Sequence, residues 1–200
     1  MKAVLCKAFG PASSLVLEEI ASPSPAKNEI LLDVHAAGVN FPDTLIIEGK
    51  YQFKPPFPFS PGGEAAGVVA AVGEKVAHVR PGDRVMALTG WGSFAEQVKV
   101  PGYNVMPIPE GMDFASGSIP SLPANLTLLK GASLVGVFWG SFAQRQPQDN
   151  ADNFRQLFAW HAEGKLKPLV SQRFPLERAG DAIDALGQRK AVGKVVVEVR

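Results

Sequence analysis

Three polar residues, Asn40, Asp43 and Tyr51, follow one another closely in this 200-residue sequence and could do chemistry together. An asparagine side chain offers both a hydrogen-bond donor and an acceptor. Asp43 lies one turn into a short predicted helix, and Tyr51 could bond a carbonyl oxygen or only pack its ring. Asn40 could equally serve as the N-cap of that helix. From the residue types alone, a ligand-binding role and a structural role for Asn40 both remain open.

A fourth candidate is the run Gly-Val-Phe-Trp-Gly at residues 136–140. Phe138 and Trp139 are large rings that could contact a ligand or pack in a core, and both alternatives stay open. The run belongs to an apolar, β-branched stretch, so we expect one buried strand there.

Other motifs are better explained by structure. Residues 90–95, GWGSFA, match the G-x-G-x-x-A dinucleotide pattern and follow a predicted strand. The pattern binds pyrophosphate only where a helix follows, and here a short alternating segment ends at Pro101. We therefore interpret these glycines as a turn between strands. His35, His78 and His161 lack metal-ligand spacing, which favours a site without metal.

The composition indicates which classes of partner are unsuitable and in which compartment the protein is expected. There are 20 basic and 19 acidic residues, a net charge of +1, and no basic block, which argues against nucleic acid and anionic membranes as partners. Cys6 is the only cysteine, so no internal disulfide can form, and the expected location is the reducing cytosol. The sequence shows no signal peptide and no apolar run long enough to span a bilayer.

The pattern of apolar residues predicts a β-rich first half and a mixed second half. A helix should begin after Asn40, with Pro42 early in it and Gly49 at its end. A second helix is expected over residues 150–163, ending at Gly164, and a third carries Ala179, Ile183 and Leu186. The expected strands cover residues 2–9, 15–20, 29–39, 64–72, 94–100, 104–108, 133–139, 169–176 and 193–199, and residues 80–88 should form a turn followed by a strand.

Four motifs together resemble a known family. GVNFPDTLIIEGKY (38–51), PFSPGGEAAGVVAAVGEKVAHVRPGDRVMAL (58–88), GSFAEQVKV (92–100) and GMDF (111–114) are similar to the N-terminal catalytic domain of the quinone oxidoreductase branch of the medium-chain dehydrogenase/reductase superfamily. Residues 122–140 and 174–199 resemble the C-terminal part of the same family. The likeness covers almost the whole chain.

The resemblance implies a mainly β fold with a few helices (α+β): a GroES-like, chaperonin-10-like, partly open β-barrel, with a remnant strand and helix of a Rossmann domain. Zinc-dependent members carry Gly-His-Glu where this chain has Gly62-Gly63-Glu64, and they carry a four-cysteine lobe that this chain cannot supply. The likeness is thus to the zinc-free branch, which reduces quinones or other activated alkenes by hydride transfer from NADPH.

Compared with that family, most of the nucleotide-binding domain is missing. GMDF runs directly into ASGSIPSLPANL, so the apparent junction lies near residues 114–115. We expect residues 1–200 to form a single catalytic domain. Within it, residues 115–164 are the residual end of the nucleotide-binding domain, and residues 165–200 return to the barrel.

A residual half-site for the nicotinamide end is what the resemblance implies. It would comprise Asn40, Asp43, Tyr51 (also the candidate catalytic residue), Phe138, Trp139 and Gly140. Without a phosphate cradle, NADPH should not bind stably, so we expect a folded chain without turnover. The strand at 132–142 should pair with its copy to give a homodimer. The alternatives are a minimal active reductase and a non-enzymatic oligomerising barrel module.

Overall fold

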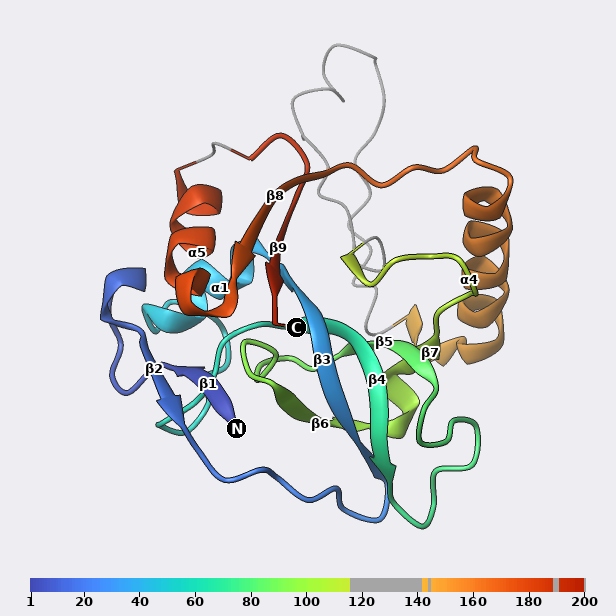
Figure 1. Ribbon diagram of the computed structural model, residues 1–200, viewed down its shortest axis with the longest axis horizontal. Coiled ribbons are helices and arrows are strands. Elements are labelled where there is room, and N and C mark those ends of the chain that lie inside the picture. The colour runs from blue at the N-terminus through green and yellow to red at the C-terminus, as the bar shows by residue number, and fades with distance from the viewer. Residues whose placement is uncertain (116–141, 144, 189–190, 200) are drawn as a thin grey trace. The chain divides into compact units, whose positions relative to one another are not determined.

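The computed structural model describes residues 1–115, 142–143, 145–188 and 191–199. The chain divides into two compact units. One combines Met1–Ile119 with Leu169–Arg200, and the other is Pro120–Pro168. The two ends of the chain therefore fold together, and the first unit is mainly β with a few helices (Figure 1).

The strands of the first unit are β1 Lys2–Leu5, β2 Val16–Glu19, β3 Glu29–Val39, β4 Glu64–Val72, β5 Arg84–Leu88, β6 Gln97–Pro101, β7 Val105–Pro107, β8 Val170–Pro175 and β9 Lys194–Glu198. Its helices are α1 Phe41–Ile47 and α5 Ala179–Gly187, with 3-10 turns η1 Ala12–Ser14, η2 Gly102–Asn104 and η4 Leu176–Arg178. The second unit contains α4, Pro147–Ala162.

Strand β3 is the centre of the seven-stranded sheet, whose order is β7-β5-β4-β3-β9-β8, with β6 also paired to β3. Strand β4 pairs along most of β3. Strands β6 and β9 then share the opposite edge: β6 pairs with Glu29–Asp33 and β9 with Ala36–Val39. Among the described strands the sheet does not close, because β7 and β8 form its two ends, as a partly open barrel requires.

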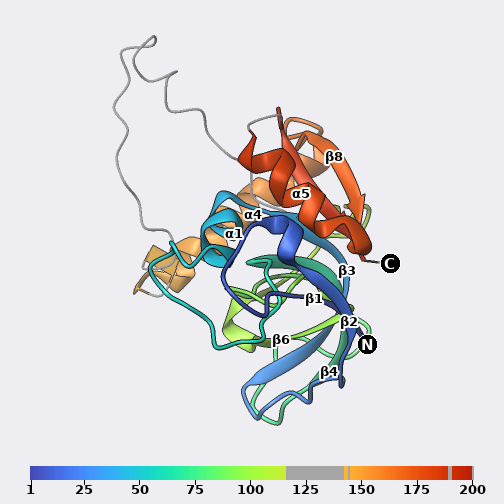
Figure 2. The same cartoon turned by 90° about the vertical axis from the view of Figure 1, so that its left-hand side faces the viewer.

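The first part of β3 alternates between buried and less buried residues. Ile30, Leu32 and Val34 lie at every second position and are fully buried, as expected for a strand with one face on the core. In β9, by contrast, the successive residues Val195–Val197 are all buried, the mark of a strand covered on both faces. Helix α5 packs on β8 and β9 through its buried apolar stripe (Figure 2).

The predicted hairpin at the N-terminus is confirmed: β1 and β2 pair antiparallel, with η1 in the connection. This small sheet is joined to the rest of the unit by the amide of Val4, which donates to the carbonyl oxygen of Phe94 at 2.8 Å. The stretch around 90–95 is a turn, as predicted. Gly90 and Gly92 adopt positive φ angles of 75° and 107°, and strand β6 follows.

Helix α4 begins at Pro147, three residues before the predicted start, because proline fits the first helical position. It stops before Gly164, which has a φ of 71°. No residue of α4 is buried. Residues 132–141, with Phe138, Trp139 and Gly140, lie outside the described residues. Phe142, the last residue of the expected 132–142 strand, is helical instead, because its carbonyl accepts from Gln146 at 2.8 Å.

Candidate functional site

The first turn of α1 is organised by Asn40 and Asp43. Asn40 is the N-cap, as its sequence position predicted. Its backbone N–H donates to Asp43 Oδ2 at 2.7 Å, while the Asp43 N–H donates to the Asn40 carbonyl at 2.9 Å. The second carboxylate oxygen of Asp43 accepts from the Gly62 N–H at 3.2 Å. Asp43 therefore ties the start of the helix to the loop before β4.

Burial makes Asp43 a weaker acid than an exposed aspartate, because it raises the pKa of the carboxyl group. Loss of hydration in the interior raises its pKa from 3.8 to about 7, although the N–H groups of Asn40 and Gly62 favour the charged form. Glu64 adds to the rise by repulsion, and Lys194 opposes it. The carboxyl group therefore changes between its protonated and its charged form near neutral pH.

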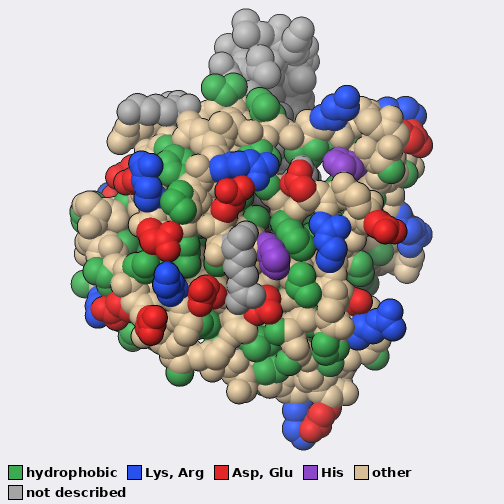
Figure 3. All heavy atoms as spheres, in the orientation of Figure 1, with side chains coloured by type: hydrophobic (Ala, Val, Ile, Leu, Met, Phe, Trp, Pro, Cys, Tyr) green, Lys and Arg blue, Asp and Glu red, His purple; other side chains and the backbone are tan. Residues whose placement is uncertain are grey.

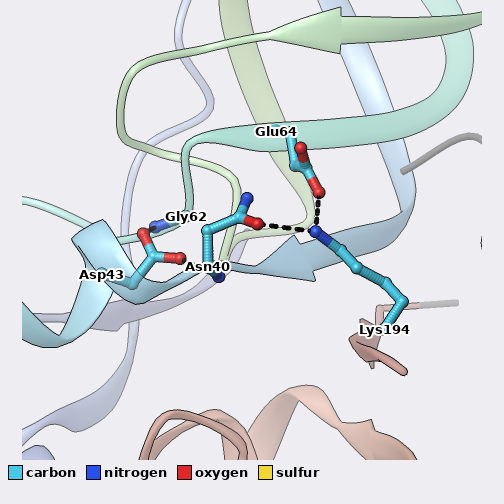
Figure 4. Close-up of polar contacts among 5 residues, drawn as sticks. All are labelled: Asn40, Asp43, Gly62, Glu64 and Lys194. Atoms are coloured by element: carbon cyan, nitrogen blue, oxygen red, sulfur yellow. Dashed lines mark hydrogen bonds and ion pairs between the residues drawn. The ribbon is translucent and has the colours of Figure 1, made fainter. Parts of the chain in front are cut away.

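A buried ion pair lies beside Asn40. Lys194, the first residue of β9, pairs with Glu64, the first residue of β4, and both side chains are more than nine-tenths buried. The same ammonium donates to Asn40 Oδ1 at 2.7 Å. Figure 4 shows the ammonium between the carboxylate and the amide. One cation thus links β9 and β4 to the residue that begins α1.

Gly38 leaves the space that this ion pair occupies. It pairs with Glu64 across β3 and β4 and with Val196 across β3 and β9. A Cβ atom at Gly38 would lie 2.8 Å from Lys194 Cε and would overlap the Glu64 carboxylate. The missing side chain at position 38 is therefore a requirement of the ion pair.

Tyr51, the third predicted residue, lies in the loop after α1 and is half-buried. Its ring packs edge-on against Phe53, with centroids 4.9 Å apart, and also against the core. Phe53 in turn lies 5.8 Å from the Trp91 ring. The structure thus brings Asn40 and Asp43 together, whereas the described contacts of Tyr51 are aromatic and apolar.

Sequence reasoning missed the pairing of Lys194 with Glu64. In the sequence analysis Glu64 occurs only within the Gly62-Gly63-Glu64 stretch, and position 194 only within the expected strand over residues 193–199. The available signal was a lysine at the start of the apolar run KVVVEV, since a buried lysine requires a partner.

The described residues do not suit zinc or a phosphate group. Gly63 offers no side chain at the position of the histidine ligand, and the Glu64 carboxylate is held by Lys194. Within the described ranges, no group of three or more His, Cys, Asp or Glu side chains could hold a metal ion. Gly90 and Gly92 are followed by strand β6 and not by a helix whose N-terminus could bind pyrophosphate.

The surface carries mixed charge. On the face shown in Figure 3, basic and acidic side chains lie interspersed. Exposed ion pairs of the described residues include Lys7–Glu18 and Arg173–Glu198. Among the described helices, none combines the length and the apolar character that crossing a membrane requires.

Known proteins share both sequence and fold with this chain. Residues 26–110 match the family "Alcohol dehydrogenase GroES-like domain". The quinone oxidoreductase of Sus scrofa is 40% identical over 127 residues, which cover 62% of this chain but only 39% of the pig protein. A quinone oxidoreductase-like protein 2 homolog from Nematostella vectensis is 23% identical over 327 residues, covering 100% of this chain and 89% of that protein.

The fold agrees with that relationship. The Escherichia coli quinone oxidoreductase, solved in complex with NADPH, superposes with a TM-score of 0.81 at 18% identity, covering 100% of both chains. The site built around Asn40 and Asp43 therefore lies in the fold of an enzyme family. Residues 26–110 thus carry an alcohol dehydrogenase GroES-like domain, and the chain as a whole is similar to quinone oxidoreductases of the medium-chain dehydrogenase/reductase superfamily.

Proposed function

We propose that this chain is the catalytic, substrate-binding domain of an NADPH-dependent quinone or enone reductase that lacks its nucleotide-binding domain. On this proposal, the chain folds but does not turn over alone. The observation that carries it is the division of the chain: the ends form one compact unit that includes β9, and only residues 120–168 lie between them.

The intervening segment is short for a dinucleotide domain. From 120 to 168 there are 49 residues, whereas a single βαβ unit takes about 30 and the Rossmann fold contains two βαβαβ halves. The Nematostella alignment supports the same reading. It runs over 327 positions, and this chain has 200 residues, so at least 127 positions of the relative have no counterpart here.

The residues present fit one end of the cofactor. The Asn40 amide suits the carboxamide of a nicotinamide, and Asp43 and Tyr51 complete the proposed half-site with residues 138–140. NADPH, when bound, supplies the hydride. This chain's own residues orient the ring, and the described ones offer nothing to the pyrophosphate. Without that anchorage the donor is not held against the acceptor, and the proximity effect is lost.

Two measurements test the proposal. NADPH oxidation by a quinone, followed at 340 nm with high protein concentrations, should equal the background rate. A rate that rises in proportion to protein would instead support a minimal active reductase. Titration of NADPH fluorescence should show no saturation below millimolar protein, and a micromolar dissociation constant would contradict the half-site.

We also propose that the chain forms a homodimer through residues 132–142, in the reducing cytosol. The apolar run at 133–139 and the free, buried thiol of Cys6 support these statements. Light scattering at micromolar concentration should give twice the chain mass, and the mass of a single chain would contradict the dimer. In that case a non-enzymatic oligomerising module would also be excluded.

A further inference from the structure

We infer that Lys194 is a positioning residue. It holds the Asn40 side chain in one orientation, with the NH2 group presented to a carbonyl oxygen of the ligand. This inference rests on the proposed function, because Asn40 belongs to its half-site. It adds a residue from β9 to the part of the half-site that lies around the start of α1.

The first step is the hydrogen-bonding capacity of lysine. An ammonium group has three donors and no acceptor. The amide atom of Asn40 that lies 2.7 Å from Lys194 Nζ must therefore be oxygen, not nitrogen. A neutral partner with both a donor and an acceptor could form a hydrogen bond with either orientation of the amide. The lysine ammonium can do so with only one orientation, the one that places the amide oxygen beside it.

The second step concerns the position of the side-chain nitrogen of Asn40. Figure 4 shows the Asn40 nitrogen pointing away from the Lys194 ammonium. Asn40 is only partly buried, at the junction between β3 and α1. Its NH2 group is thus fixed as a donor, and a donor is complementary to the oxygen of a carboxamide or a quinone carbonyl. A nicotinamide and a quinone share this chemistry.

The third step is the rigidity of Lys194 itself. Its backbone N–H donates to the Leu169 carbonyl at 2.7 Å, and β9 is paired on both edges, to β3 and β8. The charge is neutralised by Glu64 and enclosed beside Gly38. The ammonium is held by Glu64 and its backbone is fixed on both edges of β9, so Lys194 restricts the amide of Asn40 that it contacts.

The test compares two substitutions that break the same ion pair. Lys194→Gln puts a group with both donor and acceptor beside Asn40, so the amide can flip. Glu64→Gln also removes the ion pair but keeps the lysine donor. The double variant, Lys194→Gln with Glu64→Gln, removes both charges of the pair and serves if a single variant does not fold. Lys99→Gln, at an exposed pair with Glu29, is the matched surface control.

The first readout needs no ligand. The side-chain 15N–1H resonances of Asn40 are identified by their absence in Asn40→Asp. We expect one sharp pair in the native protein, in Glu64→Gln and in Lys99→Gln, and a broadened or doubled pair in Lys194→Gln and in the double variant. Identical spectra in the native protein and Lys194→Gln, with backbone resonances showing an intact fold, would overturn the inference.

The second readout uses two probes, nicotinamide and tetramethyl-1,4-benzoquinone. The probe whose titration shifts the Asn40 pair identifies the source of the carbonyl. Loss of one oriented hydrogen bond should raise its dissociation constant by about fivefold in Lys194→Gln and in the double variant, and by less than about twofold in Glu64→Gln.

Different outcomes test the role of Lys194 and the proposed function of the chain. If neither probe moves the Asn40 pair, or if Lys194→Gln binds like the native protein, the inference is wrong. NADPH turnover by the native chain would overturn the proposed inactivity but leave the role of Lys194 intact. An equal loss of binding in Lys194→Gln and Glu64→Gln would show that the ion pair only maintains the fold.

Discussion

The ammonium of Lys194 lies 2.7 Å from the side-chain oxygen of Asn40, although 154 positions separate the two residues. The contact joins the last strand to the N-cap of α1. The site is consequently assembled from both ends of the chain. A substitution in β9 can therefore change the orientation of the Asn40 side chain, although the two residues lie far apart in the sequence.

Removing one partner of the buried ion pair should be costly. Lys194→Met leaves the Glu64 carboxylate uncompensated in the interior, and we expect a loss of about 3–5 kcal/mol in the free energy of unfolding. Urea denaturation followed by circular dichroism measures it. The double variant, Lys194→Met with Glu64→Leu, should lose clearly less than the sum of the single losses; simple additivity would show that the pair is not coupled.

Gly38→Ala tests the space required by that pair. The new methyl group would push Glu64 and Lys194 apart, and we expect a loss of about 1–3 kcal/mol. Gly63→Ala is the matched control, because its Cβ would lie 3.7 Å from the Gly90 carbonyl oxygen, an ordinary contact. Equal urea midpoints for the two variants would be inconsistent with the crowding at Gly38.

The acidity of Asp43 predicts a pH-dependent stability. Because its folded pKa of about 7 exceeds 3.8, the folded state binds more protons than the unfolded state between these values. The contribution of Asp43 is therefore present at low pH, falls as the pH rises from about 4 to about 7, and then stays constant. Urea midpoints measured from pH 4 to pH 8 should show this fall relative to Asp43→Asn. Parallel profiles for both proteins would contradict the raised pKa.

Deleting residues 169–200 should prevent folding. The deletion removes β8, α5 and β9, and it exposes one edge of β3 together with core residues such as Val39. The expected product is an insoluble or unfolded chain, measured by circular dichroism and by the dispersion of amide resonances. A cooperative unfolding transition in the shortened chain would show that the last strand is dispensable.

The local elements were predictable because local patterns determine them. Strand β3 and strand β4 have the bounds that alternation and small apolar runs indicated, and α1 begins after Asn40 and ends before Gly49 as the cap signals required. The start of α4 differed by a few residues, since the apolar periodicity used to locate it begins later than the helix itself.

The polar site was only partly predictable. Asn40 and Asp43 are three residues apart, so a helix start brings them together whatever the rest of the fold does. The contact of Lys194 depends on β9 lying against β3, which no local pattern specifies. The roles of Tyr51 and of residues 138–140 remain predictions that the binding experiments test.

The shared edge of β3 also bears on how the protein is made. Strand β9 begins at Lys194, far along the chain from its partner residues Ala36–Val39 in β3, so that part of the β3 edge has no partner until synthesis has reached β9. A nascent chain still attached to the ribosome must carry an open, apolar strand edge, which invites association with other chains. Docking of β9 against β3 is then the step that covers this edge.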